Sequence, residues 1–461
     1  MARFLQSLRH ILGIGSSSPS TINPSSFGRS IDTDFTVFRE GDRAIIHGRS
    51  PYLTKPLKRG DRTEVSRGLL FHDDIIGKAV WDPIKAHKGK EFRLSLPTLE
   101  DYVAFTPRLV TPIYGADASL IVSLLDIHVS HPTTADGDNT SSAQPLEILE
   151  AGTGHASLTL HLARAIQAAN TNPPPIPAKS QVRILNNQPI HPYADEEEKE
   201  LRKEKKDSLV EEAQKQWDEW RTRHRQAVIH TVDVSAKYSA HAEKIVRGFR
   251  RGIYAGNIDF HVGPVEEWIA DQVQRRRKKR DDSAGLLSSF KSTRPADVEP
   301  FLSYAILDMP SAHQRIPHVA PVLRRGGNLV VFMPSITQIG DCVQLIGKER
   351  LPFVLEKVVE LGVGLTSGRM WDVRMAVKKS RADPSSWGSK TEASREGAEM
   401  DHGEKEEESS EPVLPTDTRD ERIDESNNVL ICRPKVGLRI VGGGFIGIWR
   451  RVEDRSNSGD K

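Results

Sequence analysis

Short apolar segments alternate with helix-like segments along much of this 461-residue chain, and this alternation limits the possible folds more than any other feature. The apolar segments have the length and composition of buried strands, and they lie at residues 146–149, 227–232, 257–262, 304–307 and 328–333. Helical spacing of apolar residues occurs between them, at residues 156–169, 239–249 and 316–323. Further helices are expected at residues 117–127, 341–350 and 354–361, and late strands at residues 429–432, 437–441 and 445–451. The pattern predicts an α/β fold with a Rossmann-like, doubly wound sheet.

The chain is too long for one compact core, so we expect several parts. Turn and strand signals predict a small N-terminal β-rich domain at residues 35–108, followed by the α/β domain at residues 109–452. Three polar or charged segments interrupt the second domain as expected surface insertions, at residues 170–226, 271–300 and 378–428. Within the first of these, residues 196–225 suggest a solvated helix without an apolar face. Residues 453–461 are expected to be a disordered tail.

The N-terminal segment, residues 1–31, contains three arginines and precedes the first acidic residue, Asp32. It combines one apolar helical face with a Ser/Pro-rich stretch, which is typical of a mitochondrial transit peptide; a tail with a chance helix is the alternative. The basic run at residues 275–280 makes nuclear localisation the other possibility. With only Cys342 and Cys432, no disulfide scaffold or cysteine-rich metal site is expected, and no apolar stretch is long enough to cross a membrane.

A glycine-containing motif, Glu150-Ala151-Gly152-Thr153-Gly154, lies where the first strand ends and a helix begins. Ligands of open α/β sheets bind at the carboxyl ends of the strands, where glycines allow close backbone approach and a helix N-terminus favours a carboxylate. A nicotinamide-cofactor motif would need a glycine at Ser157. The glutamate two positions before the first glycine suits a cofactor with an ammonium group, and an ordinary strand-to-helix turn is the alternative.

Two aspartates follow other predicted strands. Asp233 ends the second strand, where an acidic residue commonly binds ribose hydroxyls; a helix cap is the alternative. Asp308 ends the fourth strand in Leu307-Asp308-Met309-Pro310, which directs its carboxylate toward the same edge of the sheet; a turn-forming aspartate is the alternative.

These residues and several others resemble the catalytic subunit of the tRNA (adenine-58-N1) methyltransferases. The similarity covers most of residues 35–452 outside the three insertions. It rests on the glycine motif, Asp308-Met309-Pro310, Trp371-Asp372-Val373-Arg374, Arg433-Pro434, Phe71-His72-Asp73-Asp74-Ile75-Ile76-Gly77-Lys78 and Tyr114-Gly115-Ala116-Asp117.

The resemblance implies a class I methyltransferase domain joined to the N-terminal β-rich domain. It implies an S-adenosyl-L-methionine-dependent enzyme that methylates N1 of adenine in the T-loop of tRNA, assembled as a homo- or hetero-tetramer with a related subunit. Asp308 would be the catalytic residue, and Tyr114 and Asp117 would contact the substrate. The cofactor would be held by Glu150, Gly152, Thr153, Gly154, His155, Ala156, Ser157 and Asp233, and no metal ion is expected.

The chain departs from the family pattern at several positions. Ala156 replaces a glycine, Thr111 replaces a glutamine, and residues 260–264 lack the acidic residue expected after the third strand. Residues 442–445 also differ from the family's Gly-His-Thr-Gly-Phe segment. These changes favour an alternative, a catalytically weak or inactive RNA-binding subunit that supports an active partner. The retained Glu150 and Asp308 favour activity, and the N-terminal similarity argues against a methyltransferase for another substrate.

The implied reaction assigns Asp308 a specific task, which is to accept a hydrogen bond from the exocyclic amine of adenine. RNA binding also requires positive charge to meet phosphate. The candidates are the run at residues 275–280 and the trio Arg247, Arg250 and Arg251; for the run, a solvated segment is the alternative.

Overall fold

The computed structural model describes residues 31–48, 51–65, 68–89, 91–131, 144–185, 208–284, 298–362, 371–377, 428–434 and 443–453. The chain divides into two compact units, Met1–Thr366 with Val441–Lys461, and Ser367–Ile440. The expected transit peptide, the third insertion up to residue 427, the expected strand at residues 437–441 and the tail from residue 454 lie outside the described residues.

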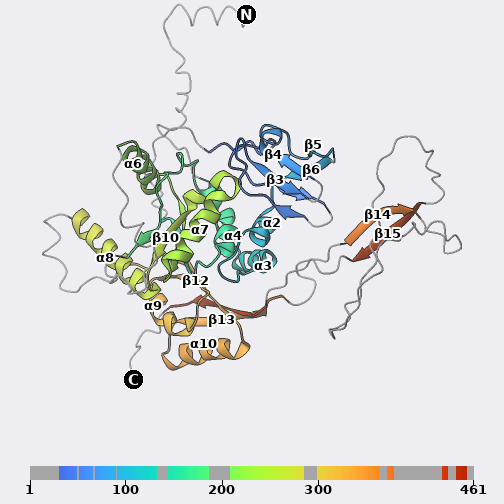
Figure 1. Ribbon diagram of the computed structural model, residues 1–461. Coiled ribbons are helices and arrows are strands. Elements are labelled where there is room, and N and C mark those ends of the chain that lie inside the picture. Colours follow the sequence, from blue (N-terminus) through green and yellow to red (C-terminus); the bar gives the residue numbers. More distant parts are fainter. Residues whose placement is uncertain are drawn as a thin grey trace, which may run out of the picture. The chain divides into compact units, whose positions relative to one another are not determined.

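An eight-stranded sheet forms the centre of the first unit, in the order β13-β16-β12-β11-β7-β9-β10-β8. Figure 1 labels its strands β10, β12 and β13. The pairings among β8 to β12 and β7 are parallel, and β16 is antiparallel to both β12 and β13. The strands are β7 (Leu146–Ala151), β8 (Arg183–Ile184), β9 (Ala227–Asp233), β10 (Ile258–Val262), β11 (Leu302–Leu307), β12 (Leu323–Met333), β13 (Phe353–Glu360) and β16 (Phe445–Arg451). The chain extends the sheet from β7 through β9 to β10 and then returns to β11 on the other side of β7. Such a switch point is where open α/β sheets bind ligands.

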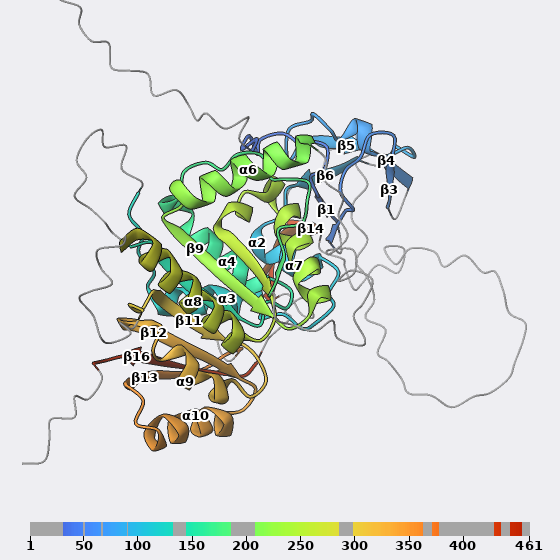
Figure 2. The ribbon, with the colours of Figure 1, turned by 90° about the vertical axis from the view of Figure 1, so that its left-hand side faces the viewer.

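Helices cover both faces of this sheet. One face packs against α3 (Gly115–Leu125), α4 (Ser157–Ile166) and α7 (Ala236–Gly248). The other packs against α8 (Val265–Ala284), α9 (Ile316–Val319) and α10 (Ile336–Lys348), so that α7 and α8 lie on opposite sides of the strands in Figure 2. Within β7, Ile148 joins the first apolar core and Leu149 the second, because successive side chains of a strand point to opposite faces. The expected Rossmann-like α/β fold is confirmed.

A separate small β-rich part precedes the large sheet, as expected. Its antiparallel sheet has the order β2-β1-β6-β5. The strands β3 and β4, which come between β2 and β5 in the chain, form a separate two-stranded hairpin. The elements are β1 (Ile45–His47), β2 (Tyr52–Leu53), β3 (Arg62–Val65), β4 (Gly68–Phe71), η1 (His72–Asp74), β5 (Pro83–Lys85), β6 (Glu91–Ser95) and α2 (Leu99–Phe105).

The histidine–acid turn of this part has a structural role. His72 is 1% exposed, and its Nδ1 accepts a hydrogen bond from the amide of Lys58 at 2.9 Å. Its Nε2 lies 2.8 Å from Thr63 Oγ1, and Asp73 accepts a hydrogen bond from the Gly60 amide at 2.9 Å. The turn therefore fixes the loop before β3 against β4.

The segment at residues 170–226 is more closely integrated than the sequence indicated. It contributes β8 to the large sheet and contains the helix α6 (Ser208–Arg223). Trp217 and Trp220 on this helix are 2% and 1% exposed, and Trp220 Nε1 donates a hydrogen bond to Thr171 Oγ1 at 3.0 Å. The expectation that this helix lacks an apolar face was wrong, because two tryptophans three residues apart share one face of it.

Two other segments differ from the sequence-based expectation. Residues 271–284, placed at the start of the second insertion, continue helix α8. The helix expected at residues 354–361 is wrong: this segment is strand β13, which pairs antiparallel with β16 and has an irregularity between Leu355 and Lys357. Its three β-branched valines, Val354, Val358 and Val359, favour an extended backbone although their spacing also fits a helix.

In the second unit the structure describes one two-stranded antiparallel sheet, made of β14 (Trp371–Val377) and β15 (Asn428–Pro434). Its register pairs Trp371 with Pro434 and Asp372 with Arg433, so two family-like segments that are far apart in sequence form neighbouring strands. Short 3-10 turns complete the described structure at Gln167–Ala169, Arg250–Gly252, Ala255–Asn257 and Ala312–Arg315. None of the described helices has both the length and the apolar character needed to cross a lipid bilayer.

Candidate functional site

The glycine motif and the Asp308 segment interlock at the switch point of the sheet. The amide of Asp308 donates a hydrogen bond to the oxygen of Ala151 at 2.8 Å. Gly152 has a φ of +100°, and a Cβ atom there would lie 1.9 Å from the main-chain oxygen of Asp308. Position 152 therefore requires glycine for two reasons, its backbone conformation and the close passage of the Asp308 strand end.

Three acidic side chains, which we call the carboxylate cluster, gather at the carboxyl ends of β7, β9 and β11: Glu150, Asp233 and Asp308. The pKa of Glu150 is raised to about 8, mainly by burial and to a smaller extent by the charges of Asp308 and Asp233, while a 2.7 Å hydrogen bond from Thr159 Oγ1 opposes the rise. Burial, followed by the charge of Asp233, raises the pKa of Asp308 to about 7. Burial also raises the pKa of Asp233.

No cation balances this cluster within the described part of the chain, where neither a lysine, an arginine nor a histidine forms an ion pair with any of the three carboxylates. Ionising all three groups in one place is unfavourable unless a positive charge is supplied. The site thus suits a ligand that carries positive charge.

Asp233 accepts hydrogen bonds from two neighbouring segments of main chain, and it is not itself the cap of α7. Its Oδ1 accepts a hydrogen bond from the amide of Ser235 at 2.9 Å, and Ser235 is the N-cap residue of α7. Its Oδ2 accepts one from the amide of Gly154 at 3.2 Å. The carboxylate thus orders the start of α7 and the glycine loop; ribose binding by the same group stays a prediction.

The other predicted cofactor residues form the loop and the start of α4. Thr153 Oγ1 lies 2.8 Å from Thr231 Oγ1, and Ser157 Oγ donates a hydrogen bond to the oxygen of Ile113. His155 is 2% exposed, and its Nε2 lies 3.1 Å from Thr106 Oγ1. Burial, followed by the charges of His241 and Arg108, lowers the pKa of His155 to about 4, which keeps its ring neutral near pH 7. These buried side chains hold the loop in shape, so main-chain groups would make its contacts to a ligand.

Tyr114 and Asp117, the predicted substrate residues, lie at the start of α3. Tyr114 is the N-cap residue, and its hydroxyl accepts a hydrogen bond from Arg108 at 3.0 Å. Asp117 is 7% exposed, and its Oδ1 accepts a hydrogen bond from the amide of Gly362 at 3.1 Å. Asp117 therefore ties α3 to the end of β13, and substrate contact by either residue stays a prediction.

The end of β10 lacks the acidic residue that the resemblance predicts, and an apolar side chain packs there. Gly263 has a φ of +148°, and a Cβ atom there would lie 2.5 Å from Leu185 Cδ1. Leu185, whose amide donates a hydrogen bond to the oxygen of Val262 at 3.1 Å, comes from the segment at residues 170–226. Leu185 therefore packs against Gly263, and the sequence held no signal that would have found this contact.

A buried polar network that the sequence analysis missed crosses β9 and β10. Side-chain atoms of His230, Asp259 and His261 lie within 4.8 Å of one another, close enough to hold a metal ion. However, Asp259 accepts hydrogen bonds from Arg225 at 2.7 and 2.8 Å and a third from Arg221. Because two arginines already balance this carboxylate, the network is better explained as a link between the segment that contains α6 and the sheet.

The predicted RNA-contacting cations differ in their availability. Arg247 pairs with Glu243 at 2.7 Å, and Arg251 pairs with Asp42 at 2.7 Å, so both serve the fold. The run at residues 275–280 lies in the C-terminal half of α8. Arg275 pairs with Asp271 at 2.7 Å and Arg276 with the buried Glu147 at 2.6 Å, and the side chains of residues 277–280 are exposed.

Comparison with known proteins adds an independent observation. The sequence is 24% identical over 331 residues to the tRNA (adenine(58)-N(1))-methyltransferase TrmI of Thermus thermophilus, a match that covers 72% of this chain and 86% of that protein. A second strain of the same organism provides a TrmI with the same identity and coverage. The chain resembles the tRNA (adenine-58-N1) methyltransferases. The resemblance inferred from the motifs is thereby confirmed, although no protein-family model matches the chain.

Two solved structures are also similar to the chain. One is an S-adenosylmethionine-dependent O-methyltransferase from Thermotoga maritima, 12% identical, with a TM-score of 0.47 over 91% of this chain and 96% of that chain. The other is the tRNA (m1A58) methyltransferase TrmI from Aquifex aeolicus, 14% identical, with a TM-score of 0.43 over 90% of this chain and 99% of that chain.

Proposed function

We propose that this protein uses S-adenosyl-L-methionine to methylate N1 of adenine in the T-loop of tRNA. The observation that carries the proposal is the carboxylate cluster of Glu150, Asp233 and Asp308 beside the glycine loop. When bound, this cofactor supplies a methyl group activated on a positively charged sulfur, and it also carries an ammonium group. Its charge is what the cluster lacks, and the sequence similarity to TrmI supports the choice of substrate.

Asp308 would act on the adenine. Its carboxylate would accept a hydrogen bond from the exocyclic amine, which raises electron density at N1. Methylation leaves a positive charge on the base, and the negative carboxylate would stabilise that charge as it develops. Accepting this bond requires the ionised form, so we expect kcat/KM to rise as the pH increases through about 7, the pKa of Asp308.

The glycine loop would position the cofactor, and the surrounding fold would align the methyl group with N1. Gly152 and Gly154 turn the main chain into the start of α4, and the N-terminus of that helix would favour the carboxylate of the cofactor. Most of the rate gain in such a displacement comes from proximity and orientation. The target base must be turned out of its folded loop to reach Asp308.

The deciding experiment uses the purified protein, labelled cofactor and unmodified tRNA. We expect label in the tRNA and a reverse-transcription stop at the target adenine. Asp308→Ala should lower kcat/KM by about 10²- to 10³-fold, as loss of one group that stabilises developing charge commonly does. Asp341→Asn, which changes an exposed carboxylate on α10, is the matched control and should leave the rate unchanged. Full activity of Asp308→Ala would exclude the proposed role.

A second candidate is a weak or inactive RNA-binding subunit that supports an active partner. Leu185 favours it, because this side chain packs at the end of β10 where an acidic residue is expected to meet the cofactor's adenine. Titration calorimetry with S-adenosylhomocysteine separates the two candidates. Cofactor binding together with methyl transfer by this chain alone supports the enzyme, whereas transfer that appears only after a related subunit is added supports the second candidate.

Two further properties belong to the same proposal. We propose a homo- or hetero-tetramer, which light scattering of the purified protein with and without a related subunit would test.

We also propose a mitochondrial location directed by residues 1–31, with nuclear import through residues 275–280 as the alternative. Imaging of a reporter fused to residues 1–31, compared with the same fusion carrying its three arginines as glutamines, tests the location.

A further inference from the structure

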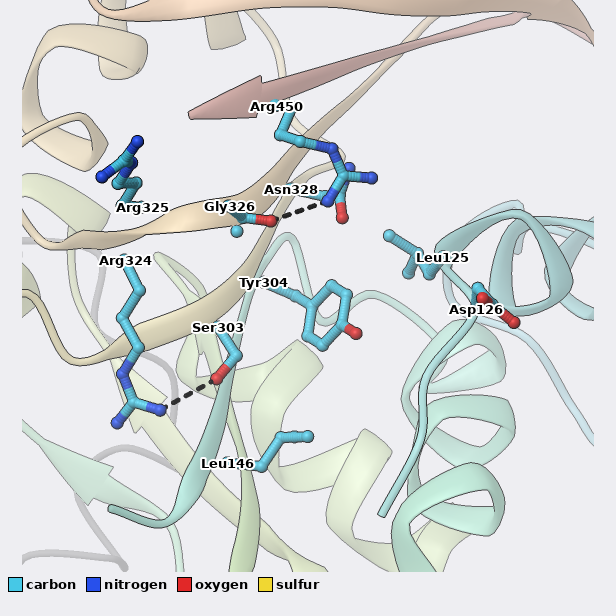
Figure 3. Close-up of a pocket in the computed structure, with 11 residues that line it drawn as sticks. Leu125, Asp126, Leu146, Ser303, Tyr304, Arg324, Arg325, Gly326, Asn328 and Arg450 are labelled. Atoms are coloured by element: carbon cyan, nitrogen blue, oxygen red, sulfur yellow. Dashed lines mark hydrogen bonds between the residues drawn. The ribbon is translucent and has the colours of Figure 1, made fainter. Parts of the chain in front are cut away.

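A basic pocket of about 340 Å³ lies at the opposite edge of the large sheet from the carboxylate cluster. Its lining includes Leu146, Ser303, Tyr304, Arg324, Gly326 and Arg450 (Figure 3). Leu146 is the first residue of β7 and Tyr304 the third of β11, so the pocket lies at the amino ends of these parallel strands. At about 3.3 Å per residue, the run of β7 places the two edges roughly 16 Å apart.

Arg324 has no ion pair among the described residues, although the charge of Glu147 acts on it from farther away. Its guanidinium donates hydrogen bonds only to neutral acceptors, Ser303 Oγ at 3.3 Å and the oxygen of Pro145 at 3.1 Å. Its Nε is buried without a hydrogen-bond partner, and no carboxylate among the described residues forms an ion pair with it. Arg324 therefore retains a full positive charge toward an incoming anion.

Arg450 adds a second cation on another side of the pocket. It donates a hydrogen bond to the oxygen of Gly326 at 2.8 Å, and it donates to both carboxylate oxygens of Glu356, which balances its charge. A neighbouring hollow of about 580 Å³ shares Arg325, Gly326 and Arg450 with the pocket. Gly326, which lies within β12 and has a φ of +78°, lines both hollows. Arg325 is paired with Glu453, so among the described residues Arg324 is the arginine of this pocket that has no ion pair.

An aromatic ring occupies the middle of the pocket. Tyr304 is half-buried, and Figure 3 shows its ring between Arg324 on one side and Leu125 on the other, with Leu146 nearby. Burial, followed by the charge of Asp126, a carboxylate that also lines the pocket, raises the pKa of its hydroxyl above the usual value, so the ring is uncharged at neutral pH. An uncharged ring flanked by guanidinium groups is the combination that binds single-stranded nucleic acid, since bases stack on the ring and phosphates pair with the cations.

We propose that this pocket binds one unpaired nucleotide of the RNA substrate, with the base against Tyr304 and the phosphate at Arg324 and Arg450. The pocket would be a second RNA contact, remote from the methylated base, and would anchor the substrate while the base reaches the carboxylate cluster. This inference rests on the proposed function in that it takes RNA as the substrate. A free nucleotide shares the same chemistry, so the test must distinguish the two.

The experiment measures binding of fluorescent, unmodified tRNA to the full-length protein at several salt concentrations, without a methyl donor. We expect Arg324→Gln to weaken binding about tenfold and to reduce the slope of log affinity against log salt by about 0.7–0.9, the contribution of one phosphate contact. Arg324→Lys should keep the slope. Tyr304→Leu should weaken binding about 5- to 150-fold, the range for loss of one stacked base, whereas Tyr304→Phe should bind as the parent does.

Controls separate the pocket from general effects. Arg223→Gln removes an exposed arginine that pairs with Glu219 on α6, away from the pocket, and should leave both affinity and slope close to those of the parent. Competition with adenosine monophosphate at millimolar concentration should leave tRNA bound; displacement at micromolar concentration would assign the pocket to a free nucleotide and overturn the proposal. Thermal midpoints verify folding, and the pairs Arg324→Lys and Tyr304→Phe remain informative if the larger changes unfold the protein.

Methylation kinetics distinguish failure of this inference from failure of the proposed function. If both are correct, Arg324→Gln raises the KM for tRNA and leaves kcat unchanged. If the variants methylate tRNA with the parent's KM, the pocket is not an RNA site although the function stands. If no variant or parent methylates tRNA but the binding losses occur, the RNA site stands without the function. A change in sedimentation coefficient caused by Tyr304→Leu would instead assign the pocket to a subunit interface and overturn the proposal.

Discussion

Among single residues, Ala156 shows most directly how a departure from the family pattern is accommodated. It precedes α4 with a φ of +59° and a ψ of +24°, which is a left-handed conformation. For a residue with a Cβ atom this conformation costs about 1–2 kcal/mol. The side chain is fully buried, so its methyl group recovers part of that cost by packing. The main chain at position 156 thus has a conformation typical of glycine although the residue is alanine.

We expect Ala156→Gly to change the free energy of unfolding by less than about 1 kcal/mol, because relief of backbone strain offsets the lost methyl packing and the added chain entropy. The matched control is Ala163→Gly, at an equally buried position inside α4. There no strain is relieved, so the cost should be about 1–2 kcal/mol. Chemical denaturation measures both variants, and equal losses would contradict the assigned strain.

Asp308 makes the stability of the protein depend on pH. Its pKa is about 7 in the folded protein, against an ordinary value of 3.8, because of burial and the charge of Asp233. Between about pH 4 and pH 7 the folded protein therefore holds a proton that the unfolded chain has released, and stability falls as the pH rises. Asp308→Asn cannot ionise. The thermal midpoint of the variant minus that of the parent should increase from pH 4 to pH 7 and stay constant above pH 7. A difference that does not change from pH 4 upward would refute the raised pKa of Asp308.

Among the elements, those predicted well from sequence have a strong local signal. The strands β7, β9, β10 and β11 are short and rich in apolar residues, which is typical of strands buried between two layers of helices. Strand β13 was missed because its apolar spacing fits a helix and a strand equally well, and pairing with β16 decides between them. Local spacing contains no information about that partner.

In the candidate site too, some features follow from local sequence and others depend on segments that are distant in the chain. Glu150, Asp233 and Asp308 were found because strand ends are recognisable in sequence and the topology brings such ends together. The contact of Gly152 with the main chain of Asp308 and the packing of Leu185 on Gly263 could not be foreseen, since each joins segments that are distant in the chain. Long-range packing, rather than local propensity, determines these details.

The packing of helix α6 can be tested by mutation, because this mostly charged helix buries two tryptophans on one face. Trp220 contacts Gly256, where a Cβ atom would lie 2.7 Å from the indole ring. We expect Trp220→Ala to lower the free energy of unfolding by about 3–5 kcal/mol, as for other large-to-small changes in a core. Lys215→Ala, on the exposed face of the same helix, should change it by less than about 0.5 kcal/mol. Similar small effects from both variants would mean that α6 does not pack as described.

Within the first unit as a whole, one side chain connects the N-terminal β-rich part to the α/β part. Arg251, which follows α7, donates hydrogen bonds to both carboxylate oxygens of Asp42 at 2.9 and 2.7 Å. It also donates to the main-chain oxygens of Asp32, Asp34 and Val37 at 3.1, 2.8 and 3.0 Å. Because the Arg251 side chain is 12% exposed and that of Asp42 is 2% exposed, water screens this ion pair little.

Removing this arginine should therefore loosen one part of the unit and spare the other. In Arg251→Ala, Asp42 becomes a buried charge without its partner, a change that commonly costs about 3–5 kcal/mol. We expect faster hydrogen exchange for the amides of residues 36–57 and unchanged exchange in β7, β9 and β11. Arg39→Ala, which breaks an exposed pair with Asp32, should cost less than about 1 kcal/mol and leave both regions protected. Equal acceleration across both parts would show that the unit unfolds as one cooperative body, and Arg251 would then stabilise the whole unit instead of joining two separable parts.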